Sequence, residues 1–394
     1  MKTFRLFHLF AALAAAATAH ADLASLFTNV ESNARTVKPR LPSIIFIQCH
    51  DLAPGDLSCY GQTNYQTPNL DRLAAEGLRF THYTGGADMP ATTAQLLAGK
   101  ISAPAPGEPN IAQRLKNAGY HTGLIGEWNL ASQPWLHGFD EFAGFLEDGE
   151  AQNYYPDALW RYPHVIYGDD LKIQKIQLEH EMIYPNTGGA RGQYLPDLFT
   201  KAMVNFVKNN DPDRANHFQP YFLLVNFPAP RTATTGADDF PVPSDAPFTG
   251  EAWPQAAKNR AALITRLDDN LGRLREQLGK SKMSNSVAIF FAGSCAPEKF
   301  ANTNLNFLLP ADQLRNAKKP ALQHLPLIVN WPGFVPAGRV SKLAVSPADF
   351  APTALEMAWA KPAPGLTGIS LLPVLENRKQ TNTVDVPDRL TPQF

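Results

Sequence analysis

The distribution of hydrophobic and polar positions along the chain predicts alternating strands and helices. Ser43–Cys49 is an apolar run rich in β-branched residues, which is typical of a strand buried on both faces. Similar runs occur at His121–Gly126, Tyr221–Phe227, Val287–Ala292 and Leu325–Asn330. Helical patterns lie between them, at Leu70–Glu76, Pro109–Ala118, Pro196–Lys208 and Ala256–Leu278. This alternation predicts an α/β fold with a doubly wound, mostly parallel sheet flanked by helices.

Two local features refine this expectation. Asn69 precedes the apolar positions of the first helix and is a candidate N-cap, while Gly77 is a candidate helix end. The segments 148–194 and 231–254 show neither helical nor strand periodicity. We therefore expect both segments to be long loops.

The first residues have the pattern of a secretory signal peptide. Lys2 and Arg5 precede the short, alanine-rich apolar run Leu6–Ala17, and Ala19-His20-Ala21 has the small-residue spacing of a cleavage site. The apolar run is shorter than a membrane-spanning helix requires, and no later segment is long and apolar enough to be one. We expect cleavage after Ala21 and a periplasmic or secreted protein without a transmembrane segment.

Composition narrows the class of protein. The 35 Lys and Arg residues balance 36 Asp and Glu residues, which argues against nucleic acid as a partner. Hydrophobic residues make up 44% of the chain, as expected for a globular protein with a substantial core. The three cysteines exclude a disulfide framework.

The residues that follow the predicted strands are candidates for a functional site. In open parallel sheets, ligands bind beyond the carboxyl ends of the strands. The positions just after these strands include His50, Asp51, Glu127, Asn129, Arg231, Ser294 and Cys295.

A series of motifs extends from Pro42 to Leu375. In chain order they include Pro42–Gly61, Thr67–Phe80, Gly119–Gly126, His137–Phe142, Leu263–Asp268, Pro326–Gly333 and Gly368–Pro373. Together they resemble the sulfatases of the alkaline-phosphatase superfamily. The resemblance implies an alkaline-phosphatase-like fold whose C-terminal subdomain is absent or truncated. The parts expected are a signal peptide (1–21), a linker (22–41), a sulfatase-like domain (42–376) and a short polar tail (377–394).

The resemblance also implies a nucleophile position, and this chain departs from the family there. Sulfatases use a cysteine converted to formylglycine, and the match of Leu96–Lys100 to the family's Leu-Leu-Thr-Gly-Lys places Met89 at that position. Thr93 stands where the family has a supporting arginine. Thr92 or Thr93 as a replacement nucleophile is an alternative, but both are expected to support the first turn of a helix. Asp88 is expected to cap that helix.

The family's metal ligands and cations are also mostly replaced. A calcium ion held by carboxylates, together with Lys, His and Arg side chains, stabilises the transition state in that family. His50 and Asp51 occupy the first pair of metal positions, and Ser294 and Cys295 the second. Glu127 and Asn129 stand where the resemblance implies a lysine and a histidine, and Arg231 stands where it implies a second histidine. Only Asp51 and Lys318 match the family's functional residues.

These departures predict a catalytically degenerate sulfatase-like protein with a binding or scaffolding role, for a sulfated glycan or a partner protein. One alternative is an active hydrolase of sulfate or phosphate esters with a rebuilt site. Another is a gene product without a function. No cofactor is expected, because the calcium of the family is predicted to be lost.

The metal positions allow three interpretations. His50, Asp51 and Cys295 form a softer ligand set than an all-oxygen cage and would suit zinc, with His324 or water as a further ligand. Alternatively, Cys295 packs as a small hydrophobic residue and His50 is a hydrogen-bonded histidine. A Cys49–Cys295 disulfide is a third interpretation.

Overall fold

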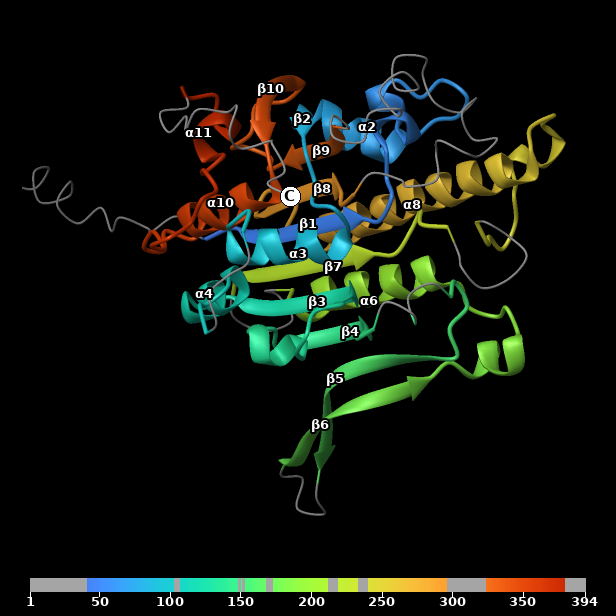
Figure 1. Cartoon of the computed structure of the whole chain (residues 1–394), viewed down its shortest axis with the longest axis horizontal. Coiled ribbons are helices and arrows are strands. Elements are labelled where there is room, and N and C mark those ends of the chain that lie inside the picture. The colour runs from blue at the N-terminus through green and yellow to red at the C-terminus, as the bar shows by residue number, and fades with distance from the viewer. Residues whose placement is uncertain are drawn as a thin grey trace, which may run out of the picture. The chain divides into compact units, whose positions relative to one another are not determined.

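The computed structural model describes residues 41–102, 107–147, 150, 153–167, 173–211, 219–232, 240–295 and 324–379. Ten strands of this part of the chain form one sheet, in the order β10-β2-β9-β8-β1-β7-β3-β4-β5-β6 (Figure 1). The strands are β1 (Ser43–Cys49), β2 (Leu78–Tyr83), β3 (His121–Glu127), β4 (Glu141–Phe145), β5 (Ala158–Tyr167), β6 (Ile173–Met182), β7 (Tyr221–Phe227), β8 (Val287–Gly293), β9 (Leu325–Asn330) and β10 (Arg339–Val345).

Helices connect the strands. The α-helices are α2 (Pro68–Ala75), α3 (Met89–Ala98), α4 (Ile111–Asn117), α6 (Leu195–Asn209), α8 (Gln255–Lys280), α10 (Phe350–Met357) and α11 (Leu372–Leu375). The short 3-10 helices are η1 (Pro54–Asp56), η2 (Ser58–Tyr60), η3 (Pro134–His137), η4 (Tyr184–Gly189), η5 (Phe248–Gly250) and η8 (Pro347–Asp349).

The sheet is mixed, with a parallel centre. Strands β8, β1, β7, β3 and β4 pair in parallel with one another in that order, whereas β9 pairs antiparallel with both β8 and β2. At the other edge, β5 and β6 form an antiparallel extension of β4. The predicted α/β sheet flanked by helices is confirmed, and parallel pairing is concentrated at the strands that carry the candidate site.

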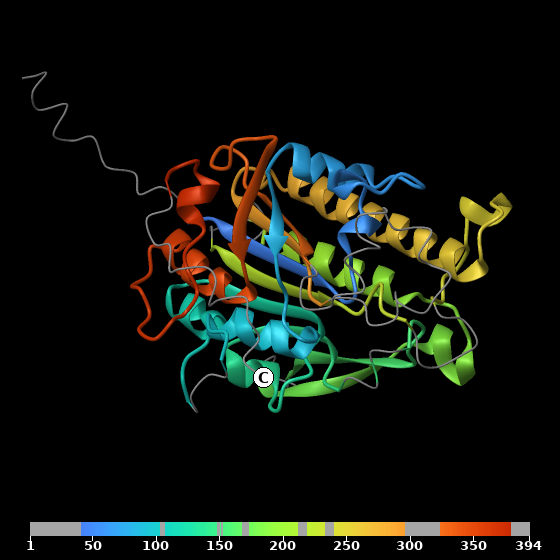
Figure 2. The same cartoon turned by 45° about the horizontal axis from the view of Figure 1, so that its top comes forward.

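Each face of the sheet packs against its own layer of helices. In β1, Ile45 and Ile47 join the hydrophobic cluster formed with α2, α6 and α8, whereas Ile44 and Phe46 join the cluster formed with α3, α4 and α10. This alternation follows from the two-residue period of a strand. Figure 2 shows α8 and α6 along one face and α3 with α10 along the other. Both faces of the central strands are therefore buried, which explains their continuous apolar runs.

The prediction of a long loop over 148–194 is wrong. Strands β5 and β6 lie within this segment as a paired hairpin at the edge of the sheet. A register shift between Arg161 and His164 interrupts the pairing. Side chains of β6 from Ile176 onward are exposed or half-buried. This edge pair therefore lacks the apolar pattern that identified the central strands.

The capping role predicted for Asn69 is also wrong. Helix α2 begins at Pro68, so Asn69 lies within its first turn. The backbone N–H groups of Asn69 and Leu70 donate to the carboxylate of Asp268 in α8, at 3.1 and 2.7 Å. The free N–H groups at the start of α2 are thus satisfied by a carboxylate about 200 positions later in the chain. No local sequence pattern indicates this partner.

Some expectations concern residues outside the described ranges. The predicted signal peptide, most of the linker and most of the polar tail lie there, since residues 1–40 and 380–394 are not described. Within the described part of the chain, no helix has both the length and the apolarity needed to cross a bilayer.

Candidate functional site

The candidate site lies at the carboxyl ends of β1 and β8, beside the first turn of α3. The two strands are parallel neighbours, with Cys49 opposite Gly293, and the Ser294 N–H continues the ladder by donating to the Cys49 carbonyl at 2.9 Å. His50 and Cys295 therefore leave the sheet side by side. This register is the physical reason that two segments 245 positions apart share one site.

His50, Asp51 and Cys295 converge at this point. The His50 Nδ1 lies 3.0 Å from Asp51 Oδ1, and the Cys295 Sγ lies 3.3 Å from the same oxygen and 3.7 Å from the His50 Nδ1. His50 and Cys295 are buried, and Asp51 is half-buried. The three side chains thus form a compact cluster of nitrogen, oxygen and sulfur donors at the strand ends.

The backbone around this cluster is held by a buried arginine. Arg260 of α8 donates through Nη2 to the Asp51 carbonyl at 2.9 Å and forms two hydrogen bonds with the carboxylate of Asp56. Its Nη1 donates to the Pro230 carbonyl at 2.9 Å. Asp51 has a φ of 59°, in the left-handed region, so this anchoring stabilises a conformation that a non-glycine residue seldom adopts.

The electrostatic environment makes His50 and Asp51 a charged pair. Burial alone would lower the pKa of His50, but its hydrogen bonds with Asp51 and Cys295 raise that pKa well above the usual value. Burial likewise opposes the charge of Asp51, yet the contact with His50 lowers the pKa of this carboxyl, assisted by Cys295 and Arg260. Each partner therefore stabilises the charged form of the other.

The first turn of α3 is built by capping and by close packing. The Asp88 carboxylate accepts from the Ala91 N–H at 2.7 Å, which confirms the predicted cap. Met89 is the first residue of α3 and is 1% exposed. A Cβ at Gly85 would lie 2.0 Å from the Ser294 carbonyl oxygen. The loop before α3 can therefore pack directly on the end of β8 only because position 85 is glycine.

Thr92 and Thr93 both have structural hydrogen bonds. The Thr92 hydroxyl donates to the Ser294 carbonyl at 2.6 Å and accepts from the Gly86 N–H at 2.7 Å. The Thr93 hydroxyl accepts from the Gln48 side chain at 2.7 Å. Both threonines are buried. Their hydroxyls tie α3 to the strand ends, as expected for residues that support the first helical turn.

Glu127 and Arg231 form a further charged pair near these strand ends. Glu127 is the last residue of β3 and is 1% exposed, and its Oε1 lies 3.9 Å from Arg231 Nη1. The Tyr154 hydroxyl donates to the Arg231 carbonyl at 2.6 Å, and Asn226 donates to the Glu127 carbonyl at 2.7 Å. Asn129, two residues after Glu127, has a φ of 49°. The buried carboxylate therefore has a basic partner that is itself held in place.

Comparison with known proteins identifies the family. The family model for sulfatases matches residues 42–360, most of the chain. The chain belongs to the sulfatase family. It is 28% identical to N-acetylgalactosamine-6-sulfatase of Homo sapiens, over 86% of this chain and 66% of that protein. It is 25% identical to N-acetylglucosamine-6-O-sulfatase of Bacteroides thetaiotaomicron, over 91% of this chain and 75% of that protein. This sulfatase-family chain thus spans just under two thirds of the human relative's length.

Solved structures agree with the family and the fold. The chain matches the crystal structure of Ps i-CgsB in complex with k-i-k-neocarrahexaose, with a TM-score of 0.66 and 26% identity over 86% of this chain and 77% of that one. It also matches the phosphonate monoester hydrolase of Agrobacterium radiobacter, with a TM-score of 0.57 and 18% identity over 87% and 79% of the two chains. The second likeness concerns the fold alone. Together they place the sheet of this sulfatase-family chain among alkaline-phosphatase-like structures.

The structure brings together only part of the predicted metal set. Among the described residues, the cluster consists of His50, Asp51 and Cys295. The ring of His324 lies instead against His82, with ring centroids 4.6 Å apart. Cys49 and Cys295 are both free thiols, so the disulfide interpretation is wrong. Lys318 lies outside the described residues.

The donor set does not fit the calcium ion that the family implies. Calcium takes six to eight oxygen ligands, several of them from carboxylates. The cluster of this sulfatase-family chain offers one carboxylate, beside an imidazole nitrogen and a thiol sulfur. The Ser294 hydroxyl adds an oxygen nearby, 3.5 Å from the Cys295 sulfur, but no charge. These donors therefore do not make a calcium site.

Sequence reasoning missed Arg260 as a supporting residue of the site. It is 1% exposed and links α8 to the segments that follow β1 and β7. A signal was present, because Arg260 precedes the apolar positions Ile264, Leu267 and Leu271 at helical spacing. A charged residue in phase with a buried helical stripe indicates a buried ion pair, although its partner Asp56 cannot be identified from the helix alone.

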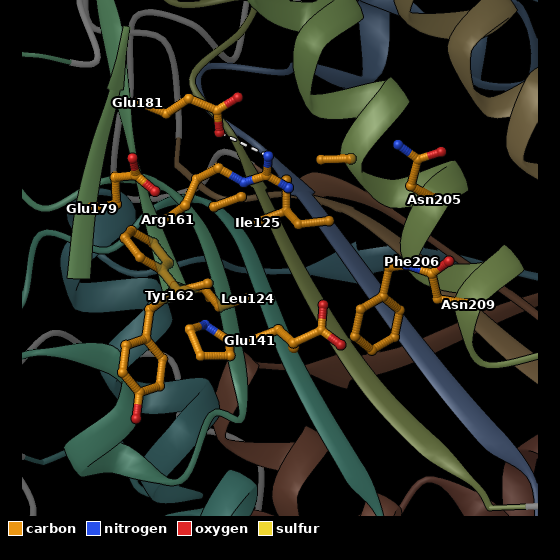
Figure 3. A pocket seen from close by; sticks show the side chains of 15 residues that line it. Leu124, Ile125, Glu141, Arg161, Tyr162, Glu179, Glu181, Asn205, Phe206 and Asn209 are labelled. Atoms are coloured by element: carbon orange, nitrogen blue, oxygen red, sulfur yellow. Dashed lines mark hydrogen bonds and ion pairs between the residues drawn. The ribbon is translucent and has the colours of Figure 1, made fainter. Parts of the chain in front are cut away.

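A cavity of about 330 Å³ lies away from these strand ends, between α6 and the β3–β6 part of the sheet (Figure 3). Glu141, Glu179 and Glu181 line it, and Arg161 is the one basic residue among the described residues that do so. Arg161 forms an ion pair with Glu181 at 2.7 Å. The excess of negative charge disfavours a sulfate group in this cavity, so it is not the candidate site.

Proposed function

We propose that this sulfatase-family protein is catalytically inactive and binds sulfated glycans outside the cytoplasm. The observation that carries the proposal is Met89, buried as the first residue of α3. The resemblance places the sulfatase nucleophile at this position. A thioether has no proton to lose and cannot become an aldehyde hydrate, so it cannot form the covalent intermediate on which such catalysis depends.

The charge at the site supports the same proposal. Glu127 stands where the resemblance implies a lysine, and it is almost fully buried. Sulfate-ester hydrolysis develops negative charge on oxygen atoms, which positive groups and hydrogen-bond donors must stabilise. A buried carboxylate would destabilise that charge, and Arg231, at 3.9 Å, offsets only part of the effect.

The relatives support a sulfated glycan as the ligand class. Their names describe sulfatases of N-acetylgalactosamine and N-acetylglucosamine, and one solved structure holds D-glucosamine-2-N,6-O-disulfate as its substrate. On this chain, Arg231 is the candidate sulfate-binding cation, because it is at the strand ends and its side chain is 19% exposed. A guanidinium group forms paired hydrogen bonds with oxyanions of this geometry. The signal-peptide pattern supports a periplasmic or secreted location.

The test compares binding of sulfated and desulfated glycosaminoglycan oligosaccharides by calorimetry. We expect binding that depends on sulfate and that weakens about tenfold or more in Arg231→Ala, the loss typical of one charged hydrogen bond. Arg161→Ala is the matched control, since Arg161 is a basic residue of the acidic cavity and should not affect binding. Equal affinity for sulfated and desulfated ligands, or no binding to either, would contradict the proposal.

An active ester hydrolase with a rebuilt site is the second candidate. The observation that favours it is the convergence of His50, Asp51 and Cys295, which could hold a metal ion beside a substrate. Hydrolysis of aryl sulfates and aryl phosphates with added divalent metals separates the two candidates. Metal-dependent turnover that is lost in Asp51→Asn would support this second candidate and contradict the first.

A further inference from the structure

We propose that His50, Asp51 and Cys295 form a binding site for one thiophilic divalent cation of the zinc class. The proposal is independent of glycan binding and of hydrolysis. It starts from the mismatch with calcium: the strand ends carry one nitrogen, one oxygen and one sulfur donor, all within 4.8 Å of one another. This combination suits zinc and its chemical neighbours, which accept imidazole, carboxylate and thiolate together.

The separations of the three donor atoms match a tetrahedral site. With zinc–ligand bonds of about 2.0–2.3 Å, the edges of a tetrahedron are about 3.3–3.8 Å long. The observed separations are 3.0 Å (Nδ1 to Oδ1), 3.3 Å (Oδ1 to Sγ) and 3.7 Å (Sγ to Nδ1). Shifts of a few tenths of an ångström would therefore place all three atoms around a common centre. Such a cluster needs little rearrangement to bind a cation.

Charge balance favours the same ion. Asp51 and a Cys295 thiolate would neutralise a divalent cation, while His50 would bind as the neutral imidazole. Nitrogen and sulfur ligands bind a metal only in their deprotonated forms, so binding would be linked to proton release. The nearby positive charge of Arg260 is already balanced by Asp56, with which it forms a buried ion pair at 2.7 Å. The site thus takes a doubly charged ion without leaving a net buried charge.

Three protein ligands leave one position of a tetrahedral ion open, and water fills that position in sites of this kind. The cluster therefore needs no fourth protein side chain to bind a cation.

The test uses cobalt as a spectroscopic substitute for zinc. The purified chain is stripped with a chelator and titrated with Co²⁺, and then Zn²⁺ is added in competition. We expect one equivalent of cobalt, the intense visible bands of tetrahedral Co²⁺ and a thiolate-to-cobalt charge-transfer band in the ultraviolet, all displaced by zinc. X-ray absorption of the zinc-bound wild type should show one sulfur ligand. This measurement requires no variant and therefore does not depend on whether a variant folds.

Variants assign the ligands. Cys295→Ser should abolish the charge-transfer band, and Asp51→Asn should weaken cobalt binding at least tenfold. Cys59→Ser is the matched control: Cys59 is a second cysteine outside the cluster, and its replacement should leave the spectrum unchanged. Absence of the charge-transfer band in the wild type, a zinc environment without sulfur, or a band that persists in Cys295→Ser would each overturn the proposal. None of these readouts depends on glycan binding or on hydrolysis.

Discussion

Replacement of Arg260 by alanine tests how the site is held together. The Arg260 side chain is buried and donates four hydrogen bonds, two to the Asp56 carboxylate and one each to the Asp51 and Pro230 carbonyls. It therefore connects α8 to the segments after β1 and β7. Arg260→Ala would remove all four bonds and leave the Asp56 carboxylate, which is 2% exposed, without its basic partner.

The expected loss is large because the remaining charge stays buried. Removal of one partner of a buried ion pair typically costs about 3–5 kcal/mol of unfolding free energy. The Ala53 N–H still donates to Asp56 at 2.8 Å, which places the expected value toward the lower end of this range. Arg72→Ala is the matched control, since Arg72 forms an exposed ion pair with Glu76. That replacement should cost less than about 1 kcal/mol.

The assay is urea unfolding, monitored by tryptophan fluorescence and circular dichroism. A double variant, Arg260→Met with Asp56→Asn, removes the uncompensated charge and should recover part of the loss, with a coupling of about 1–3 kcal/mol. The reasoning would be refuted if Arg260→Ala were no more destabilising than Arg72→Ala. It would also be refuted if the unfolding free energy lost in the double variant equalled the sum of the losses in Arg260→Met and Asp56→Asn measured singly.

Three further predictions concern other parts of the chain. Gly85→Ala should lower the unfolding free energy by roughly 1–3 kcal/mol in urea unfolding, because its Cβ would clash with the Ser294 carbonyl; an unchanged midpoint would contradict that packing. Burial opposes the charge of Asp140, but Lys116 and hydrogen bonds from Thr122 lower the pKa of this carboxyl below its usual value. Asp140 should therefore stabilise the fold at pH values above its unfolded-state pKa, and this stabilisation should be lost as the pH falls through its folded-state pKa. Asp140→Asn should therefore be less stable than the wild type at neutral pH, with the difference vanishing in acid; a difference independent of pH would count against it. Mass spectrometry of the exported protein should find Asp22 as the first residue, and an uncleaved N-terminus would show the signal-peptide prediction to be wrong.

The central strands could be predicted because burial on both faces leaves a simple pattern. The expected bounds Ser43–Cys49, Tyr221–Phe227 and Leu325–Asn330 are those of β1, β7 and β9. The hairpin β5–β6 could not be predicted in this way, since it lies at the edge of the sheet and lacks the continuous apolar run of a strand buried on both faces. Antiparallel pairing of β9 depends on chain connections that an apolar run does not encode.

Part of the site could be predicted for a similar reason. Residues that follow parallel neighbours in a sheet meet at one edge, so His50, Asp51 and Cys295 were expected to converge. The roles of Arg260 and Asp268 could not be assigned, because each acts on a segment about 200 positions away in the sequence. Sequence patterns report which side chains are buried, but not which distant backbone groups they satisfy.

The most direct test of the central claim is sulfate-ester hydrolysis by the wild type and by Met89→Cys. Both are co-expressed with a formylglycine-generating enzyme, beside an active sulfatase as positive control. We expect no turnover above background from either. Ala91 and Thr93 replace the proline and arginine of the modification motif, and loss of one stabilising donor alone costs about 3–4 kcal/mol of transition-state stabilisation. Sustained turnover by the wild type would contradict the account, and turnover by Met89→Cys alone would show that the rest of the site remains competent.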